Sequence, residues 1–258
     1  MKNKLFLLIL VLVIGVLGAC GTEDSNSNTD SGNEGNKTVL VMGTSADYKP
    51  FEFVDSAKGE EIIGYDIDLA NMIGEKLGID IKIQDIDFNS LVPALQAGKI
   101  DFVISGMSPN EDREKVVDFS EPYNETQQVI VVKKDSGIEA SADLAGKTVG
   151  IQTASIQETM AKEMAKTVDF KIESRTRIPE IVQDMMAKRL DAGIIESGVA
   201  RGYIEQSEEL TMFPVEVQVA DYKAIAVAEG SELKDQINQA LKELIEEGKI
   251  QDLEEKWL

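Results

Sequence analysis

The sequence contains no histidine and a single cysteine, Cys20. Without histidine, the chain cannot form the usual zinc site or any Ser-His or Cys-His nucleophile pair. Positive charge is also scarce, because 26 lysine and arginine residues stand against 47 acidic ones, for a formal net charge of −21. Nucleic acids require a basic surface, so the composition argues against a nucleic-acid partner. We also expect no metal site and no cofactor.

The N-terminal segment has the pattern of an export signal. Lys2 and Lys4 give it a positive start, residues 5–17 form an apolar run too short for a confident membrane span, and small residues precede Cys20. This pattern resembles a bacterial lipoprotein signal. The resemblance implies that residues 1–19 are a signal peptide and that Cys20 is lipidated, for example with palmitate. A core cysteine that follows a short anchor helix remains the alternative.

The segment that follows is a candidate tether. Residues 20–36 include the cysteine and then almost no apolar side chain, so they cannot bury enough surface to fold. A flexible chain of this length spans on the order of 20 Å. We therefore expect the protein to work outside the cell membrane and close to it, held by the lipid, most simply on a Gram-positive cell surface.

The remaining chain alternates between apolar runs and segments with helical periodicity. Strands are expected at 38–42, 79–83 and 100–105, and helices at 65–78 and 89–98. This βαβαβ order predicts a parallel sheet with right-handed crossovers. The polar stretch after the third strand should begin a further, charged helix.

The pattern then repeats. Residues 147–155 resemble 37–45, and 182–197 resemble 92–107. We therefore predict an α/β protein of two similar lobes, each with a parallel-core sheet, and a ligand cleft between the two sheets.

The predicted limits of the lobes follow from this repeat. Lobe 1 comprises 37–126 and 223–258, lobe 2 comprises 127–222, and strands near 127–132 and 222–228 cross between them. The C-terminal part should form two amphipathic helices that pack on lobe 1. Their apolar stripe is expected to contain Leu233, Ile237, Leu241 and Ile245.

Small hydroxyl residues and single charges follow the predicted strands, where ligands of open parallel sheets bind. Ser45, Ser105, Ser108, Ser155 and Glu196 all occupy such positions, and Arg113 lies a turn further on. A guanidinium group can hold a carboxylate with two parallel bonds, and Glu196 can take an ammonium group. The amides at the predicted helix start near Ile156 can share the carboxylate charge. Together these groups fit a zwitterion.

Six stretches together resemble the extracytoplasmic solute-binding proteins for polar amino acids (family 3), the receptors of ABC importers. They are "GTSADYKPFEF", "GYDIDLA", "DFNSLVPALQAGKIDFVISGMSPNEDR", "VDFSEPY", "GKTVGIQTASIQE" and "IIESGVA". The resemblance implies a two-lobed periplasmic-binding-protein-like (type II) fold that closes on its ligand. It also implies a free amino acid as ligand, the membrane subunits of a permease as partners, a monomer, and no enzymatic activity.

The same resemblance assigns contacts to the backbone groups of the ligand. Arg113 and Ser108 match the residues that bind the carboxylate, and Ser155 and Ile156 match its second contact. Ile156 stands where the family often has threonine, so only its amide can contribute. The ammonium group matches a site formed by Glu196 and the carbonyl of Gly106, and Ser105 stays small so that the ligand can approach.

The side chain of the ligand should lie between Tyr48 and Phe88, beside Ser45, Asp47 and Glu52, with Gln157 from the other lobe. Acids outnumber cations there, and the stretches "GTSADYKPFEF" and "SIQE" resemble the arginine/lysine-binding branch. We therefore expect arginine or another basic amino acid. Three alternatives remain open: a glutamine receptor, a dehydratase-like enzyme with a carboxylate as its acid or base, and a sensor or adhesin that does not transport.

Overall fold

The computed structural model describes residues 38–125, 127–216 and 222–258. The predicted signal peptide 1–19, Cys20 and the tether to residue 36 lie outside the described residues. Within the described part, no helix is both long and apolar enough to cross a bilayer.

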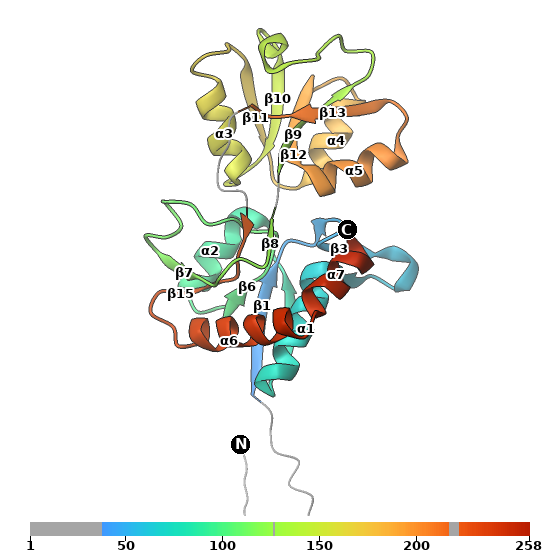
Figure 1. Cartoon of the computed structure of the whole chain (residues 1–258). Coiled ribbons are helices and arrows are strands. Elements are labelled where there is room, and N and C mark those ends of the chain that lie inside the picture. The colour runs from blue at the N-terminus through green and yellow to red at the C-terminus, as the bar shows by residue number, and fades with distance from the viewer. Residues whose placement is uncertain (1–37, 126, 217–221) are drawn as a thin grey trace, which may run out of the picture. The chain divides into compact units, whose positions relative to one another are not determined.

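The first sheet lies in the lobe that contains both α1 and the C-terminal helices (Figure 1). Its strand order is β5 (Asp80–Asp85), β1 (Val39–Thr44), β6 (Phe102–Val103), β15 (Ala226–Ala228) and β7 (Val117–Phe119). The first three strands are parallel, and β15 is antiparallel to both of its neighbours. The helices of this lobe are α1 (Tyr65–Leu77), α2 (Phe88–Gln96), α6 (Leu233–Glu246) and α7 (Lys249–Trp257).

The second sheet belongs to the other lobe and has the same parallel core (Figure 1). Its order is β11 (Lys171–Arg175), β10 (Thr148–Gln152), β12 (Ala192–Glu196), β9 (Gln128–Lys133) and β13 (Leu210–Pro214), with β9 antiparallel to its neighbours. Its helices are α3 (Ile156–Met164), α4 (Ile178–Met186) and α5 (Ser197–Gln206), and a 3-10 turn covers Ser141–Leu144.

Shorter elements complete the chain. β2 (Asp47–Tyr48), β3 (Glu52–Asp55) and β4 (Glu61–Ile63) form a small antiparallel sheet, with a 3-10 turn at Ser56–Lys58. β8 (Asn124–Glu125) pairs with β14 (Tyr222–Lys223), where the chain passes from one large sheet to the other and back. The lobe limits given above stay a prediction.

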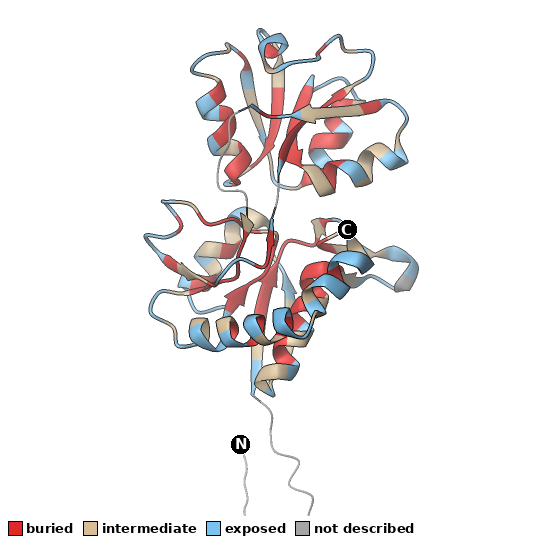
Figure 2. Cartoon of the chain, viewed as in Figure 1, coloured by how far each residue is buried: buried red, intermediate tan, exposed pale blue. Residues whose placement is uncertain are grey.

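The strand cores of both sheets are buried, whereas the outer helix faces are exposed (Figure 2). α1 ends as expected, because Gly78 adopts φ 67° and its N–H donates to the carbonyls of Glu75 and Gly74. The C-terminal helix pair is also confirmed. The apolar stripe of this pair differs from the prediction at one position, because Ile245 is exposed and Leu244 is buried instead. An α-helix has 3.6 residues per turn, so residues spaced by four rotate gradually away from the buried face.

The internal repeat is present in the two sheets, but one of its predicted alignments is shifted. Phe102 pairs with Met42, and its counterpart Ala192 pairs with Val149, so the helix-strand match holds. The same register makes Gly43 equivalent to Gly150, three residues away from the alignment of 37–45 with 147–155.

A shared packing constraint explains this shift. A Cβ at Gly43 would lie 2.4 Å from Ile100, and one at Gly150 would lie 2.6 Å from Leu190, the residue that matches Ile100 in the repeat. Each central strand therefore needs glycine where the next crossover packs against it. The position of this glycine therefore shows which residues of the two strands are equivalent, whereas the similarity of the neighbouring residues suggested a different alignment.

The predicted helix start around Arg113 is wrong. The side chain of Asn110 accepts hydrogen bonds from the backbone N–H groups of Asp112 and Arg113, and 111–116 form turns. An Asn side chain that bonds the following backbone favours a turn, and β7 begins at Val117, which leaves no length for a helix. Arg113 is thus held by a short, tightly bonded turn.

Candidate functional site

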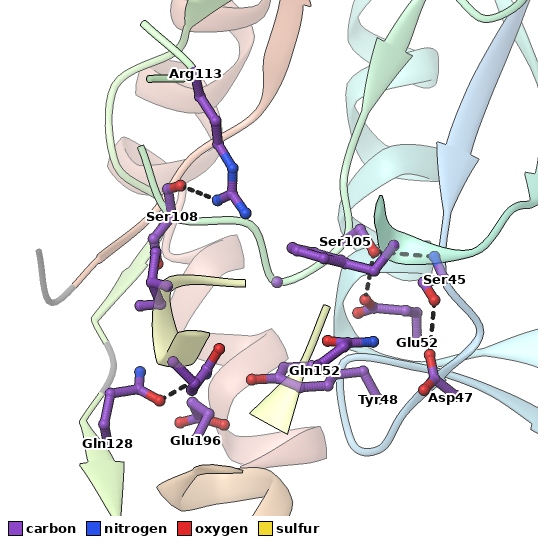
Figure 3. Close-up of a pocket in the computed structure, with 14 residues that line it drawn as sticks. Ser45, Asp47, Tyr48, Glu52, Ser105, Ser108, Arg113, Gln128, Gln152 and Glu196 are labelled. Carbon is purple, nitrogen blue, oxygen red and sulfur yellow. Dashed lines mark hydrogen bonds between the residues drawn. The ribbon is translucent and has the colours of Figure 1, made fainter. Parts of the chain in front are cut away.

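A pocket lies where β1, β6, β10 and β12 end, with residues from both sheets around it (Figure 3). Its atom-free space is about 380 Å³, including the part open to solvent. The lining residues are Ser45, Asp47, Tyr48, Glu52, Phe88, Ser105, Gly106, Ser108, Arg113, Gln128, Gln152, Ile156, Gln157 and Glu196. The position agrees with the rule that ligands of parallel sheets bind beyond the strand ends.

Arg113 is the cation of this pocket and is buried. Its guanidinium donates to the carbonyl of Ser108 and, at 2.8 Å, to the carbonyl of Ala154 from the second sheet's side. It also lies 5.2 Å from the centre of the Phe88 ring. Within the described residues it contacts no carboxylate, and burial lowers the pKa of Arg113 to about 10. The group remains charged at neutral pH and is compensated only by dipoles and an aromatic face.

The loop that carries Ala154 leads into α3, whose first residue is Ile156. Ile156 lines the pocket, so the first amides of α3 lie beside it, where a helix favours negative charge. Ser155 does not line the pocket. Its hydroxyl caps α3 by accepting from the Glu158 N–H at 3.2 Å and donates to the Gln152 carbonyl at 2.7 Å. Its hydroxyl therefore organises the loop.

Glu196 ends β12 and caps α5. Its two carboxylate oxygens accept from the N–H groups of Gly198 and Val199, each at 3.1 Å. Lys223 lies 3.9 Å from one of these oxygens and is itself fully buried, with its ammonium 3.9 Å from the Phe51 ring centre. Glu196 also lines the pocket, so its carboxylate is within reach of a bound ligand.

Tyr48 forms one wall of the pocket and packs against Gly106. Gly106 has φ 51°, and a Cβ on it would lie 2.9 Å from the Tyr48 ring. Glycine is therefore required both by the backbone conformation and by the contact. Phe88 forms another part of the wall, beside Arg113. Both aromatic residues therefore line the pocket, and the prediction that they enclose the ligand side chain stays a prediction.

A group of carboxyls lies at the Tyr48 end of the pocket. Glu52 is fully buried and accepts from the Ser105 hydroxyl at 2.9 Å, and Ser105 in turn accepts from the Ser45 N–H. Asp66, also fully buried, lies directly behind Glu52. Burial and the neighbouring Asp66 raise the pKa of Glu52 well above its usual value.

Asp47 connects the pocket to the opposite lobe. One of its oxygens accepts from the Ser45 hydroxyl at 2.8 Å, and the other accepts from the Ile178 N–H, at the start of α4, at 2.7 Å. Arg177, next to Ile178, donates to Asp85 at 3.0 Å and to Asp87 at 2.8 Å. The two lobes are therefore joined by direct polar contacts at this edge of the cleft.

Of the predicted site residues, all but Ser155 line the pocket. Sequence reasoning missed Gln128 and Gln152, although Gln152 ends β10, where the strand-end rule applies. Gln128 pairs with Glu196 across β9 and β12 and accepts from Gln157 at 2.7 Å, a position that only the register reveals. The two buried charges behind the pocket, Asp66 and Lys223, were also missed.

Comparison with known proteins decides the family. The model for bacterial extracellular solute-binding proteins, family 3, matches residues 40–258. The chain belongs to this family. As a member of family 3 it acts outside the cytoplasm, and its two-sheet α/β architecture is the two-lobed one that was predicted.

Several relatives of this family-3 protein have described ligands or roles. The arginine-binding extracellular protein ArtP of Bacillus subtilis (strain 168) is 45% identical over 259 residues, covering 100% of this chain and 98% of the relative. The substrate-binding protein of an amino acid ABC transporter has a TM-score of 0.82 at 40% identity, covering 85% and 99% of the two chains. These relatives are binding proteins, which supports transport over the enzyme alternative.

An ancestral arginine-binding protein is similar in two complexes. Bound to arginine it gives a TM-score of 0.80 at 39% identity, with 86% of this chain and 99% of that chain covered. Bound to glutamine it gives 0.79 at 38% identity, with 86% and 98% covered.

Proposed function

We propose that this protein captures a basic amino acid, arginine in the first place, and delivers it to the membrane subunits of an ABC importer. The observation that carries the proposal is that Arg113 is buried and contacts no carboxylate among the described residues. A buried guanidinium without a carboxylate partner costs free energy that an entering anion offsets. The α-carboxylate of an amino acid fits, because it accepts two parallel bonds from the planar group.

The other charged groups of the pocket support a cationic side chain. Asp47, Glu52 and Glu196 line it, whereas Arg113 is its single lining cation among the described residues. With Arg113 on the carboxylate and Glu196 on the ammonium, Asp47 and Glu52 remain for the ligand's side chain. A ligand with an acidic side chain would meet these carboxyls and be repelled.

Glutamine is the second candidate. The amide groups of Gln128, Gln152 and Gln157 line the pocket and offer both donors and acceptors to a neutral amide. The ancestral relative was obtained with arginine and with glutamine, so similar pockets accept both. A dehydratase-like reaction is less well supported, because the relatives described above are binding proteins.

In the mechanism we propose, the ligand first contacts lobe 1 through Arg113, Ser108 and the aromatic walls. Closure then adds Glu196 and the start of α3, and the closed form is recognised by the permease. The ligand drives closure only through its higher affinity for the closed state. The lobe limits that we propose are 37–126 with 223–258 for lobe 1 and 127–222 for lobe 2.

We also propose that the mature protein begins at lipidated Cys20, that residues 20–36 tether it to the outer face of the cell membrane, and that it acts as a monomer. The sequence pattern around Cys20 supports the anchor. Mass spectrometry of the protein extracted from membranes tests it, because an unmodified N-terminal cysteine would contradict the proposal.

A thermal-shift screen with the twenty amino acids tests the ligand. A ligand stabilises the folded state by RT ln(1 + [L]/Kd), about 2.7 kcal/mol at a hundredfold excess over Kd. We expect arginine to give the largest shift, lysine a smaller one, and acidic amino acids none. A large shift with glutamine alone would favour the second candidate, and no shift with any amino acid would contradict the proposal.

A further inference from the structure

The carboxyls of Glu52 and Asp66 form a buried pair with an unusual hydrogen-bond pattern. One oxygen of Glu52 accepts from Ser105, and one oxygen of Asp66 accepts from the Gly106 N–H at 2.7 Å and the Tyr123 hydroxyl at 3.0 Å. The other two oxygens, Oε2 of Glu52 and Oδ1 of Asp66, are buried and have no donor among the described residues. The two side chains interact directly. If one of the two carboxyls is protonated, its O–H can donate to the other, and both oxygens then take part in a hydrogen bond.

The surroundings contain too little positive charge for two ionised carboxylates. The titratable groups that face the pair are Asp47 from β2, Tyr48 beside it, Tyr65 from α1, Tyr123, Lys223 from β14 and Glu196 from β12. Lys223 is the only cation among them, and its closest carboxylate is Glu196. Like charges that share a buried site cannot both ionise without a large cost. Burial and the neighbouring Asp66 raise the pKa of Glu52, whereas burial raises the pKa of Asp66 against its hydrogen bonds and the Lys223 ammonium, which lower it.

We infer that Glu52 and Asp66 hold one shared proton before the ligand enters, and that a cationic ligand side chain displaces this proton into solvent. The inference rests on the proposed function, because it requires a basic side chain at this end of the pocket. The charge balances: one proton leaves as one guanidinium or ammonium group arrives. Asp66, which does not line the pocket, is then a positioning residue that sets the protonation of Glu52.

A neutral amide side chain should behave differently. It brings no charge to replace the proton, and its carbonyl can accept a bond from the protonated Glu52. The affinity for arginine should therefore rise with pH, by up to tenfold per pH unit where the pair titrates, because the complex holds fewer protons than the free protein. The affinity for a neutral analogue should not rise with pH. The ratio of the affinity for arginine to the affinity for an amide ligand should therefore fall as the pH is lowered.

Titration calorimetry at pH 7 in two buffers of different ionisation enthalpy, phosphate and Tris, measures the protons released. Arginine and citrulline form a matched pair, since they share the α-amino and α-carboxyl groups and differ in the charge of the side chain. We expect release of close to one proton with arginine and close to none with citrulline. Arginine binding with no proton release, or equal release with both ligands, would overturn the inference. Failure of arginine to bind would instead contradict the proposed function.

Asp66→Asn tests the role of the second carboxyl. The amide oxygen can still accept from Gly106 and Tyr123, and its NH₂ group can donate to Glu52, which should then ionise without a competing charge. We expect this variant to bind arginine without proton release. If this variant releases as many protons on arginine binding as the wild type, the Glu52 and Asp66 pair is not the source of the released proton. Circular dichroism checks folding, and the wild-type measurement stands if this variant does not fold.

Discussion

Arg113 is the residue to which we assign the carboxylate of the ligand. Its guanidinium is buried, donates to two backbone carbonyls and lies over Phe88, yet no described carboxylate neutralises it. Such a group is held in place before any ligand arrives, so little conformational entropy is lost when an anion binds. On the function proposed above, specificity for a carboxylate comes from a charge that the protein itself leaves uncompensated.

Gly106 offers a second test at the scale of one residue. Gly106→Ala should destabilise the fold by about 2–4 kcal/mol, because it combines a strained positive φ with a clash against the Tyr48 ring. Chemical denaturation followed by circular dichroism measures the change in the free energy of unfolding.

Gly98→Ala is the matched control for this substitution. Gly98 also has a positive φ, 64°, but a Cβ there meets no atom within 4 Å. We expect it to lose only about 1 kcal/mol, from backbone strain alone. Equal losses in the two variants would mean that the contact with Tyr48 does not constrain position 106.

At the scale of elements, the start of α4 forms a bridge between the lobes. Arg177 donates to Asp85 at the end of β5 and to Asp87 before α2, and the neighbouring Ile178 N–H donates to Asp47. If the lobes open as we propose, these bonds break, so we expect them to favour the closed arrangement. The two Arg177 bonds to Asp85 and Asp87 lie outside the residues that line the pocket.

We expect Arg177→Gln to weaken arginine binding about two- to tenfold, mainly through faster dissociation, because partly exposed ion pairs contribute roughly 0.2–1 kcal/mol each. Stopped-flow or surface-based kinetics measures the rate. The difference from wild type should shrink in 1 M salt, where exposed charges are screened.

Arg189→Gln serves as the control for this bridge. Arg189 pairs with Asp184 within the second lobe and has no partner across the cleft among the described residues. Its substitution should leave the dissociation rate unchanged. If both variants dissociate at the same rate, the bridge does not contribute to closure.

The elements also show what sequence patterns reveal. The alternating periodicities and the strand-end rule located both parallel cores and the polar residues at the strand ends, because these features depend on local order and topology. Phe88, Glu52 and Gln157 were expected in the pocket only once the family resemblance was considered. Arg113 was predicted on a helix because charge and spacing do not show that Asn110 bonds the backbone. Asp66 and Lys223 were missed because acids in first helical turns and lysines in short strands are usually solvated. Their burial arises only when distant segments meet.

At the scale of the whole molecule, the two lobes repeat one plan but contribute different chemistry. The first lobe supplies Arg113 and the carboxyls of Glu52 and Asp47, whereas the second supplies Glu196 and the start of α3. A zwitterion with a cationic side chain completes the set of charges only when both lobes surround it. The net charge of −21 adds at most a weak attraction for cationic ligands.

The most direct test of this account is calorimetry of arginine binding to the wild type and to Arg113→Ala. Removing one partner of a buried charged pair costs about 2–5 kcal/mol, so the variant should bind roughly 30- to several-thousand-fold more weakly. Circular dichroism confirms that the variant folds. An affinity for arginine that is unchanged by this substitution would contradict the central claim that Arg113 holds the carboxylate of the ligand.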